Sequence, residues 1–445
     1  MSAGDTTWVL VSAALVMIMT PGLGFFYAGM ARGKNVLATI MQSFIIVALI
    51  SVQWVLWGYS LAFGPSIGGF IGGLDWAGLN GVGQEPNGAY AATIPHMAFM
   101  IFQAMFAIIT PALITGAFAE RKKFTTFLVF TVLWATLIYD PIAHWVWSCT
   151  PIEGAETVAG CAGTPGWLRS LGALDFAGGT VVHISSGMAA LAAAIVFGKR
   201  HGFGRVPMEP HDITMTVLGA ALLWFGWFGF NAGSALAANG LAANAFVVTN
   251  TAAAAAALSW MFAAWAKSGK PSLLGAASGA VAGLVAITPA AGFVGPVAAV
   301  IIGAVAGVAC FTAIQIRNKI ALDDSLDVFG VHGVGGTWGA LATGLFASLA
   351  INSAGADGLF AGNPAQVGIQ LMAIAVTGAY SFVGTFILLK VLDAVVGLRV
   401  TREEEEAGLD ISLHGEVAPY RVLVDERTTT TTTTTVTEEV AVRKL

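Results

Sequence analysis

Long runs of apolar residues follow one another along most of this 445-residue chain, with short polar connections between them. A helix of about 20 apolar residues crosses the ~30 Å hydrocarbon core of a bilayer. Eleven runs come close to or exceed this length, at 8–31, 37–63, 93–119, 124–147, 177–198, 213–232, 244–266, 272–288, 294–316, 331–350 and 366–389. The pattern therefore predicts an all-α polytopic membrane protein with eleven transmembrane helices.

The composition supports this class. Hydrophobic residues make up 56% of the chain and charged residues only 10%, whereas a soluble domain carries about 25% charged residues. So few charges cannot give this much apolar material a water-soluble surface. The 27 Phe and 13 Trp, which are spread along the chain, also exclude a disordered protein.

The basic residues predict the direction of the helices. When the connections are sorted alternately, Arg169 is the only one of the 20 Lys and Arg residues on one side. Because basic residues are retained in the cytoplasm, we expect the N-terminus outside and the C-terminus inside. The first apolar run follows Asp5 rather than a basic segment, which favours a retained helix over a cleaved signal peptide.

Three short matches relate the first five predicted helices to the next five. They pair Phe26-Tyr-Ala-Gly29 with Phe230-Asn-Ala-Gly233, Ile109-Thr-Pro-Ala112 with Ile287-Thr-Pro-Ala290, and Asp175…His183 with Asp327…His332. An offset of five helices reverses the direction across the membrane, so the halves, about 8–198 and 213–350, form an inverted repeat typical of transporters. The helix at 366–389 is an addition to this repeat.

His183 and His332 are the strongest functional candidates within the apolar runs, where ionisable residues are rare. The repeat places both histidines near its axis, and neighbouring imidazoles can share a proton and titrate as a unit. A lone buried histidine is more often a packing residue. Metal binding is a further alternative, but the sequence offers no third ligand for it, so we expect no metal site.

Asp175 and Asp327 each precede one of these histidine-bearing runs. We favour a helix-capping role, in which a carboxylate accepts hydrogen bonds at a helix N-terminus. Direct ion binding is the alternative for both residues.

Aromatic residues gather near the outer ends of three predicted helices. Phe102 and Phe106 share a helix face, Trp147 closes the fourth run, and Phe230 lies one turn inward of Ser234. Packing and an interfacial aromatic belt would explain them. The alternative is a site for a small cation, in which ring faces attract the charge and a hydroxyl accepts a hydrogen bond.

Two regions outside the helices stand out. Cys149 and Cys161 share an outer loop at 148–176, where the sequence leaves open whether they form a disulfide, while Cys310 lies within a helix. We divide the chain into a membrane domain at 1–400, a cytoplasmic segment at 401–420 and a tail at 421–445. Within the cytoplasmic segment, the stretch 408–416 is expected to dock on the cytoplasmic face. The tail contains eight consecutive Thr residues and is expected to be disordered.

Four long motifs resemble the ammonium transporter family, which also contains methylammonium permeases and Rhesus proteins. They are Phe102-Gln-Ala-Met-Phe-Ala-Ile-Ile-Thr-Pro111, Asp175-Phe-Ala-Gly-Gly-Thr-Val-Val-His183, Gly226-Trp-Phe-Gly-Phe-Asn-Ala-Gly-Ser234 and Asp327-Val-Phe-Gly-Val-His-Gly333. They occur in order, and the resemblance extends from residue 8 to about 420. Trp147 together with Ser234 is similar to the bacterial ammonium transporter branch.

The resemblance implies roles for particular residues. It implies an outer ammonium site at Phe106, Trp147 and Ser234, a phenyl gate at Phe106 and Phe230, pore histidines at His183 and His332, and a structural aspartate at Asp175. It further implies a homotrimer in the cell membrane, regulated at its cytoplasmic face by a PII-type signal protein through 401–420. No cofactor and no nucleic-acid partner are expected.

The expected activity is uptake of ammonium, with methylammonium as a second substrate. A cation in a dry pore costs on the order of 20 kcal/mol, whereas removing a proton from an alkylammonium, with a pKa of about 10.4, costs roughly 5 kcal/mol at pH 7. We therefore expect deprotonation outside and conduction of neutral ammonia, with net proton transfer. The alternatives are an electroneutral gas channel and an ammonium sensor; an enzyme is not expected, since no nucleophile or phosphate loop accompanies the histidines.

Overall fold

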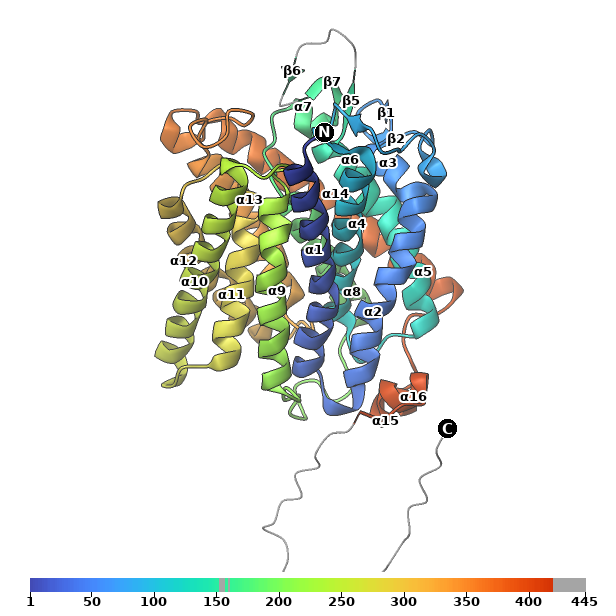
Figure 1. The fold of residues 1–445 in the computed structure, drawn as a ribbon. Coiled ribbons are helices and arrows are strands. Elements are labelled where there is room, and N and C mark those ends of the chain that lie inside the picture. Colours follow the sequence, from blue (N-terminus) through green and yellow to red (C-terminus); the bar gives the residue numbers. More distant parts are fainter. Residues whose placement is uncertain (152–156, 159–160, 419–445) are drawn as a thin grey trace, which may run out of the picture.

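The computed structural model describes residues 1–151, 157–158 and 161–418. Long helices run side by side through the molecule, with short strands at one end and the C-terminal helices α15 and α16 at the other (Figure 1). The predicted disordered tail at 421–445 lies outside the described residues. An all-α polytopic membrane architecture is thus confirmed.

The helical elements follow one another in chain order. They are α1 (Ala3–Met30), η1 (Gly33–Asn35), α2 (Val36–Gln53), η2 (Trp54–Gly58), α3 (Tyr59–Phe63), η3 (Ala77–Leu79), α4 (His96–Ile114), η4 (Thr115–Phe118), α5 (Phe124–Trp134), η5 (Ala135–Tyr139), α6 (Asp140–Trp147), α7 (Trp167–Ser170), η6 (Gly179–Ile184), α8 (Ser185–Phe197), α9 (Ile213–Gly233), α10 (Gly240–Ser268), α11 (Leu273–Ile287), α12 (Pro296–Lys319), η7 (Phe329–Gly333), α13 (Val334–Phe346), η8 (Leu359–Ala361), α14 (Ala365–Val395), α15 (Arg402–Ala407) and α16 (Leu409–His414). Consecutive elements such as α5, η5 and α6 form one continuous helix.

Within the described residues, nine helical segments are long and apolar enough to span a membrane. The two remaining predicted spans are also helical: α11 has 15 residues, and η7 continues directly into α13. Every predicted run is therefore a helix. The count of eleven spans and their direction stay predictions.

Helix pairs that the predicted repeat relates pack closely. The first helix of each half, α1 and α9, lie against each other, and a Cβ atom added to Gly219 of α9 would lie 2.3 Å from the backbone nitrogen of Phe26. In the same way, a Cβ atom added to Gly187 of α8 would lie 2.2 Å from the nitrogen of Gly333 in η7. These close approaches bring η6 and η7, which carry the two predicted histidines, into contact.

Short antiparallel strands cover the end of the bundle that carries the 148–176 loop (Figure 1). β1 (Ser66–Ile67) pairs with β2 (Ile71–Gly72), β3 (Pro86–Asn87) with β4 (Ala91–Pro95), and β7 (Cys161–Pro165) with both β5 (Cys149–Pro151) and β6 (Thr157–Val158). A disulfide joins Cys149 to Cys161, which decides a pairing that the sequence left open.

The C-terminal helices dock on the opposite end of the bundle. The Asp410 carboxylate accepts the backbone N–H groups of Leu37 at 3.1 Å and Ala38 at 2.8 Å, at the start of α2. The Asn35 side chain accepts the N–H of Leu409 at 2.8 Å. Docking of the 408–416 stretch was expected, and these bonds give it a defined place.

Candidate functional site

Two phenyl rings, from α4 and α9, meet in the interior of the bundle. The ring centroids of Phe106 and Phe230 lie 4.3 Å apart with an interplanar angle of 42°, and the side chains are 1% and 0% exposed. Phe106 also has the ring of Phe102 at 5.0 Å on its own helix. The expected pairing of Phe106 and Phe230 is present.

An outer cavity of about 330 Å³ lies on one side of this ring pair. Phe106, Trp147 and Ser234 all line it, together with Tyr90 and Arg169. The three residues of the predicted cation site come from α4, α6 and the end of α9, and so the fold brings together positions that are far apart in the sequence.

Hydrogen bonds fix the orientation of the polar groups in this cavity. The indole N–H of Trp147 donates to the carbonyl of Asp175 at 2.9 Å, and the Trp147 ring stands edge to face with Phe106 at 5.7 Å and 86°. The Ser234 hydroxyl donates to the carbonyl of Phe230 at 2.9 Å. Because its hydrogen is used in this way, the Ser234 oxygen can only accept a hydrogen bond from a ligand.

A narrow inner cavity of about 20 Å³ lies on the other side of the ring pair. Phe230, Trp227, His183 and His332 line it together with mostly aliphatic side chains. A volume of about 10–15 Å³ on this measure holds one water molecule. The inner cavity therefore has room for one or two molecules of that size in an apolar surrounding.

The two histidines are in direct contact within this cavity. Their Nδ1 atoms lie 3.2 Å apart, and the rings are nearly parallel with centroids 5.3 Å apart. Each histidine belongs to a π-helical turn, η6 or η7. The Nε2 atom of His183 has no hydrogen-bond partner within the described residues, which leaves it available to a small molecule in the cavity.

A third cavity, of about 440 Å³, continues the series. Leu326 and Asp327 line both this cavity and the inner one. Asp327 forms an ion pair with Arg317 at 2.9 Å; burial raises the pKa of its carboxyl to about 6, and Arg317 opposes that rise. The outer, inner and third cavities thus follow one another, and Phe106, Phe230, Leu326 and Asp327 mark the boundaries between them.

Asp175 has the structural environment of a helix cap. Its carboxylate accepts the N–H groups at the start of η6 and the Thr180 hydroxyl: Gly178 at 2.7 Å, Gly179 at 2.6 Å, Thr180 at 2.7 Å and Val181 at 3.2 Å. The left-handed φ of 116° at Gly178 turns the backbone toward the carboxylate. These bonds agree with the capping role that we favoured over ion binding.

Asp327 does not cap the equivalent helix, so the expectation of capping at this position was wrong. Asp324 accepts the N–H of Phe329 at 2.8 Å instead, and Asp327, with a φ of 63°, turns toward Arg317. The chain before η7 reverses direction at Asp327, and this turn places Asp324 rather than Asp327 at the helix start.

Trp227 is a site residue that the sequence did not single out. Its ring stacks on His183 at 5.4 Å, and its indole N–H donates to the Thr288 hydroxyl at 2.8 Å. A tryptophan in the middle of an apolar run, away from the interfacial belt, was the available signal. Within the described residues no group of three or more His, Cys, Asp or Glu side chains could hold a metal ion.

Both the sequence and the fold are similar to those of known proteins. Residues 7–419 match the model of the Ammonium Transporter Family. An ammonium transporter of Bacillus subtilis is 53% identical over 419 residues, which cover 94% of this chain and 99% of the relative. The crystal structure of Saccharomyces cerevisiae Mep2 superposes with a TM-score of 0.84 at 37% identity, covering 96% of this chain and 94% of that chain. A structure described as a Sensor Amt Protein superposes with a TM-score of 0.82 at 31% identity, covering 92% and 98%.

Proposed function

Because the chain belongs to the ammonium transporter family, we propose a transport path that runs through its three cavities in series. The protein is a multi-pass ammonium transporter of the cell membrane, and it is not an enzyme. The path by which ammonium crosses it is our proposal. The observation that carries the proposal is the phenyl pair of Phe106 and Phe230, which separates a wide polar cavity from a narrow apolar one.

Ammonium binds in the outer cavity among Phe106, Trp147 and Ser234. The faces of aromatic rings attract a cation by about 0.5–2 kcal/mol each, and the Ser234 oxygen accepts one of its N–H bonds. All three residues line this cavity, and the Ser234 hydroxyl is oriented as an acceptor. None of these three residues carries a charge, and the Asp175 carboxylate, which lines the same cavity, already accepts the N–H groups at the start of η6.

Neutral ammonia passes the phenyl gate of Phe106 and Phe230. The inner cavity is lined mostly by aromatic and aliphatic groups, with the two histidines and Asp327 as its polar members, and it has room for one or two molecules. Between the phenyl gate and the histidines a bare cation meets a desolvation cost on the order of 20 kcal/mol. Removal of a proton at pH 7 costs only roughly 5 kcal/mol. The free Nε2 atom of His183 and the paired His332 then hydrogen-bond the ammonia.

The paired histidines relay the proton that ammonium gives up: Nε2 of His183 takes it, the Nδ1 proton of His183 passes to Nδ1 of His332, and His332 releases its Nε2 proton toward the third cavity. One positive charge then crosses with each ammonia, which makes uptake electrogenic. A hydrogen bond between the two Nδ1 atoms allows one proton to be held by either ring. An electroneutral gas channel is the alternative. Similarity to a Sensor Amt Protein supports a second candidate function, sensing of ammonium through the cytoplasmic segment.

We also propose the assembly and domain organisation that the sequence implied. Three copies form a homotrimer through their 1–400 membrane domains, each with its own inverted repeat and with the N-terminus outside. The segment at 401–420 is regulatory and receives a PII-type signal protein. Docked helices α15 and α16 support such a role. Asp410 of α16 binds the start of α2, and Glu405 of α15 accepts the N–H of His201, whose neighbour Arg200 lines the third cavity.

Current measurement on proteoliposomes containing the purified protein tests this proposal. Ammonium should evoke an inward current that saturates, and potassium should evoke none. A gas channel would move ammonia without current. A sensor would give neither current nor uptake, although ammonium would still bind.

A further inference from the structure

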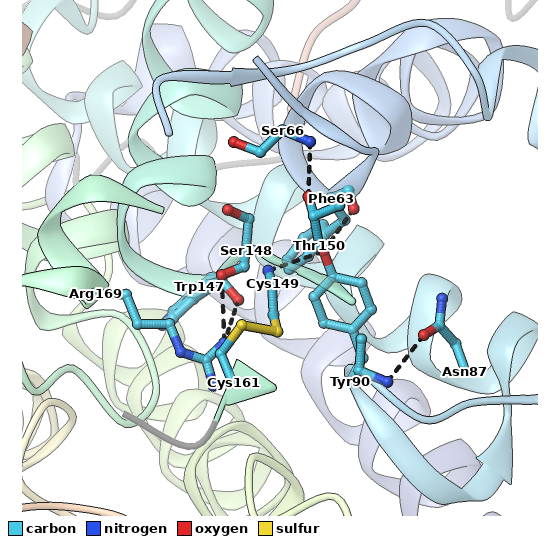
Figure 2. The surroundings of a disulfide bond; sticks show 11 residues. Phe63, Ser66, Asn87, Tyr90, Trp147, Ser148, Cys149, Thr150, Cys161 and Arg169 are labelled. Carbon is cyan, nitrogen blue, oxygen red and sulfur yellow. Dashed lines mark hydrogen bonds between the residues drawn. A yellow bond between two sulfur atoms is a disulfide. The ribbon is translucent and has the colours of Figure 1, made fainter. Parts of the chain in front are cut away.

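A buried disulfide lies next to the outer site. Cys149 is two residues beyond Trp147, and it is bonded to Cys161 with the Cα atoms 5.6 Å apart. Both cysteines are 0% exposed. Figure 2 shows the disulfide beside Trp147, Arg169 and Tyr90, three residues that line the outer cavity.

The backbone at Trp147 has no continuing helix to hold it. Trp147 is the last residue of α6, and Ser148 turns into an extended conformation. From this point the position of the indole depends on contacts made by the segment that follows. An aromatic side chain at a helix end needs such contacts to keep one orientation toward a ligand.

Those contacts form a closed circuit of covalent and hydrogen bonds that passes through the backbone of Trp147. We call this circuit the closed ring. From Trp147 the chain enters β5 at Cys149, crosses through the disulfide to Cys161, and follows β7 to α7. In α7, Arg169 donates from Nη1 to the carbonyl of Trp147 at 3.0 Å and to that of Ser148 at 3.4 Å. The disulfide is the covalent link of this ring.

Tyr90 joins the closed ring to the end of α3, which also lines the cavity. Its hydroxyl accepts the N–H of Cys149 at 3.2 Å and donates to the carbonyl of Phe63 at 2.5 Å (Figure 2). Cys149 is thus linked to Cys161 through the disulfide and to the end of α3 through Tyr90. The Trp147 indole, held at its own nitrogen by Asp175, is fixed from two sides.

We infer that the Cys149–Cys161 disulfide positions Trp147 for recruitment of ammonium. This inference depends on the proposed role of Trp147 in the outer site. The phenyl gate and the histidine pair belong to α4, α9, η6 and η7, outside the ring. Loss of the disulfide therefore weakens recruitment and leaves the maximal transport rate unchanged.

The test compares the Cys149→Ser, Cys161→Ser double variant with Cys310→Ala, which removes the free buried thiol and keeps the disulfide. In the double variant the ammonium concentration for half-maximal current should rise about 2- to 30-fold, the loss expected when a single cation–π contact is displaced. The maximal current per molecule should not change, and Cys310→Ala should behave as the unmodified protein. A lower maximal current with an unchanged half-saturating concentration would overturn the inference.

Trp147→Ala separates this inference from the proposed function. On a Trp147→Ala background, removal of the disulfide should cause no further rise, because coupled residues are not additive. If Trp147→Ala alone leaves half-saturation unchanged, the outer site itself is wrongly assigned. If Trp147→Ala raises it and the disulfide variant does not, only the positioning role fails.

Arg169→Lys provides a second variant if the serine variant does not fold. It keeps the disulfide and the positive charge in the lining of the outer cavity, and it removes the guanidinium that reaches the Trp147 carbonyl. The same selective rise in half-saturation is expected. A half-saturating concentration equal to that of the unmodified protein would contradict the closed ring.

Discussion

The Nδ1 atoms of His183 and His332 lie within hydrogen-bonding distance, 3.2 Å apart, although 149 residues separate them in the sequence. In such a bond one nitrogen donates a proton and the other accepts it. The two imidazoles therefore depend on each other, since the tautomer of one determines the tautomer of the other. Replacement of either histidine removes the shared proton.

This dependence predicts that substitutions at the two histidines are not additive. We expect His183→Ala and His332→Ala each to reduce the ammonium-evoked current strongly, and the double variant to lose little more than the more severe single variant. The measurement is a double-mutant cycle on initial currents in proteoliposomes with equal protein content. Independent, multiplicative losses would show that the histidines act separately.

The phenyl pair predicts different consequences for its two members. Phe106 lines the outer cavity and contacts Trp147, whereas Phe230 lines the inner cavity. Phe106→Ala should therefore raise the half-saturating ammonium concentration, by about 2- to 30-fold if one cation–π contact is lost. Phe230→Ala should leave it nearly unchanged and connect the two cavities.

Concentration series with ammonium and with potassium, on the same liposomes, check this distinction. A potassium current in Phe230→Ala and its absence in the unmodified protein are the expected results. Phe102→Ala is a matched control, because this ring packs on Phe106 without lining either cavity. Identical changes in all three variants would mean that the rings only maintain packing.

Much of this arrangement could be predicted from the sequence. The helices followed from apolar length alone, since a membrane requires every spanning backbone to satisfy its own hydrogen bonds. The grouping of Phe106, Trp147 and Ser234 followed from motifs shared with a family. The first signal lies in short stretches of this chain, and the second recurs in related proteins.

The remaining features depend on tertiary contacts that no short pattern encodes. His183 and His332 lie in π-helical turns, and these turns meet where Gly187 and Gly333 allow close packing. Asp324 rather than Asp327 meets the start of η7 because the chain turns at Asp327. The disulfide was undecided because spacing within a long loop does not fix which cysteines meet.

Lys122 was assigned to a cytoplasmic connection, and the structure places its amine in an aromatic box. The side chain is 1% exposed, and its Nζ atom lies 3.8 Å from the ring centroid of Phe118 and 4.2 Å from that of Phe130. Nζ has no hydrogen-bond partner within the described residues. Attraction by rings of about 0.5–2 kcal/mol is smaller than the several kcal/mol required to bury an ion, so burial holds the pKa of Lys122 well below its usual range.

Replacement of Lys122 by Met should therefore stabilise the protein, by on the order of 1–4 kcal/mol. The native protein binds fewer protons at this site than the unfolded chain, whose lysine pKa is about 10.4. The free energy of unfolding therefore decreases as the pH falls below that value. It stops decreasing at the pH where the amine of the native protein is also protonated. Lys122→Met should remove this part of the pH dependence.

Thermal unfolding of the detergent-solubilised protein across a pH series is the appropriate measurement. Lys123→Met is the matched control, because the Lys123 amine reaches the Val396 carbonyl at an exposed position. We expect little change in that variant. A lower unfolding temperature for Lys122→Met than for the unmodified protein would mean that the aromatic box stabilises a charged amine.

Asp410 predicts a way to detach the cytoplasmic segment without touching the transport path. Its buried carboxylate accepts two N–H groups at the start of α2, and hydrogen bonds to a charged group contribute about 1.5–3 kcal/mol each. Asp410→Ala leaves these N–H groups without their acceptor, and so α15 and α16 should separate from the bundle.

Trypsin should then cleave faster after Arg402, at the start of α15. Ile411→Ala, at an exposed position next to Asp410 in α16, should be cleaved at the rate of the unmodified protein, and the maximal ammonium current of Asp410→Ala should persist. If cleavage rates were equal in the two variants, Asp410 would not hold the segment; if the current were lost, the segment would belong to the transport path and would not be a regulator of it.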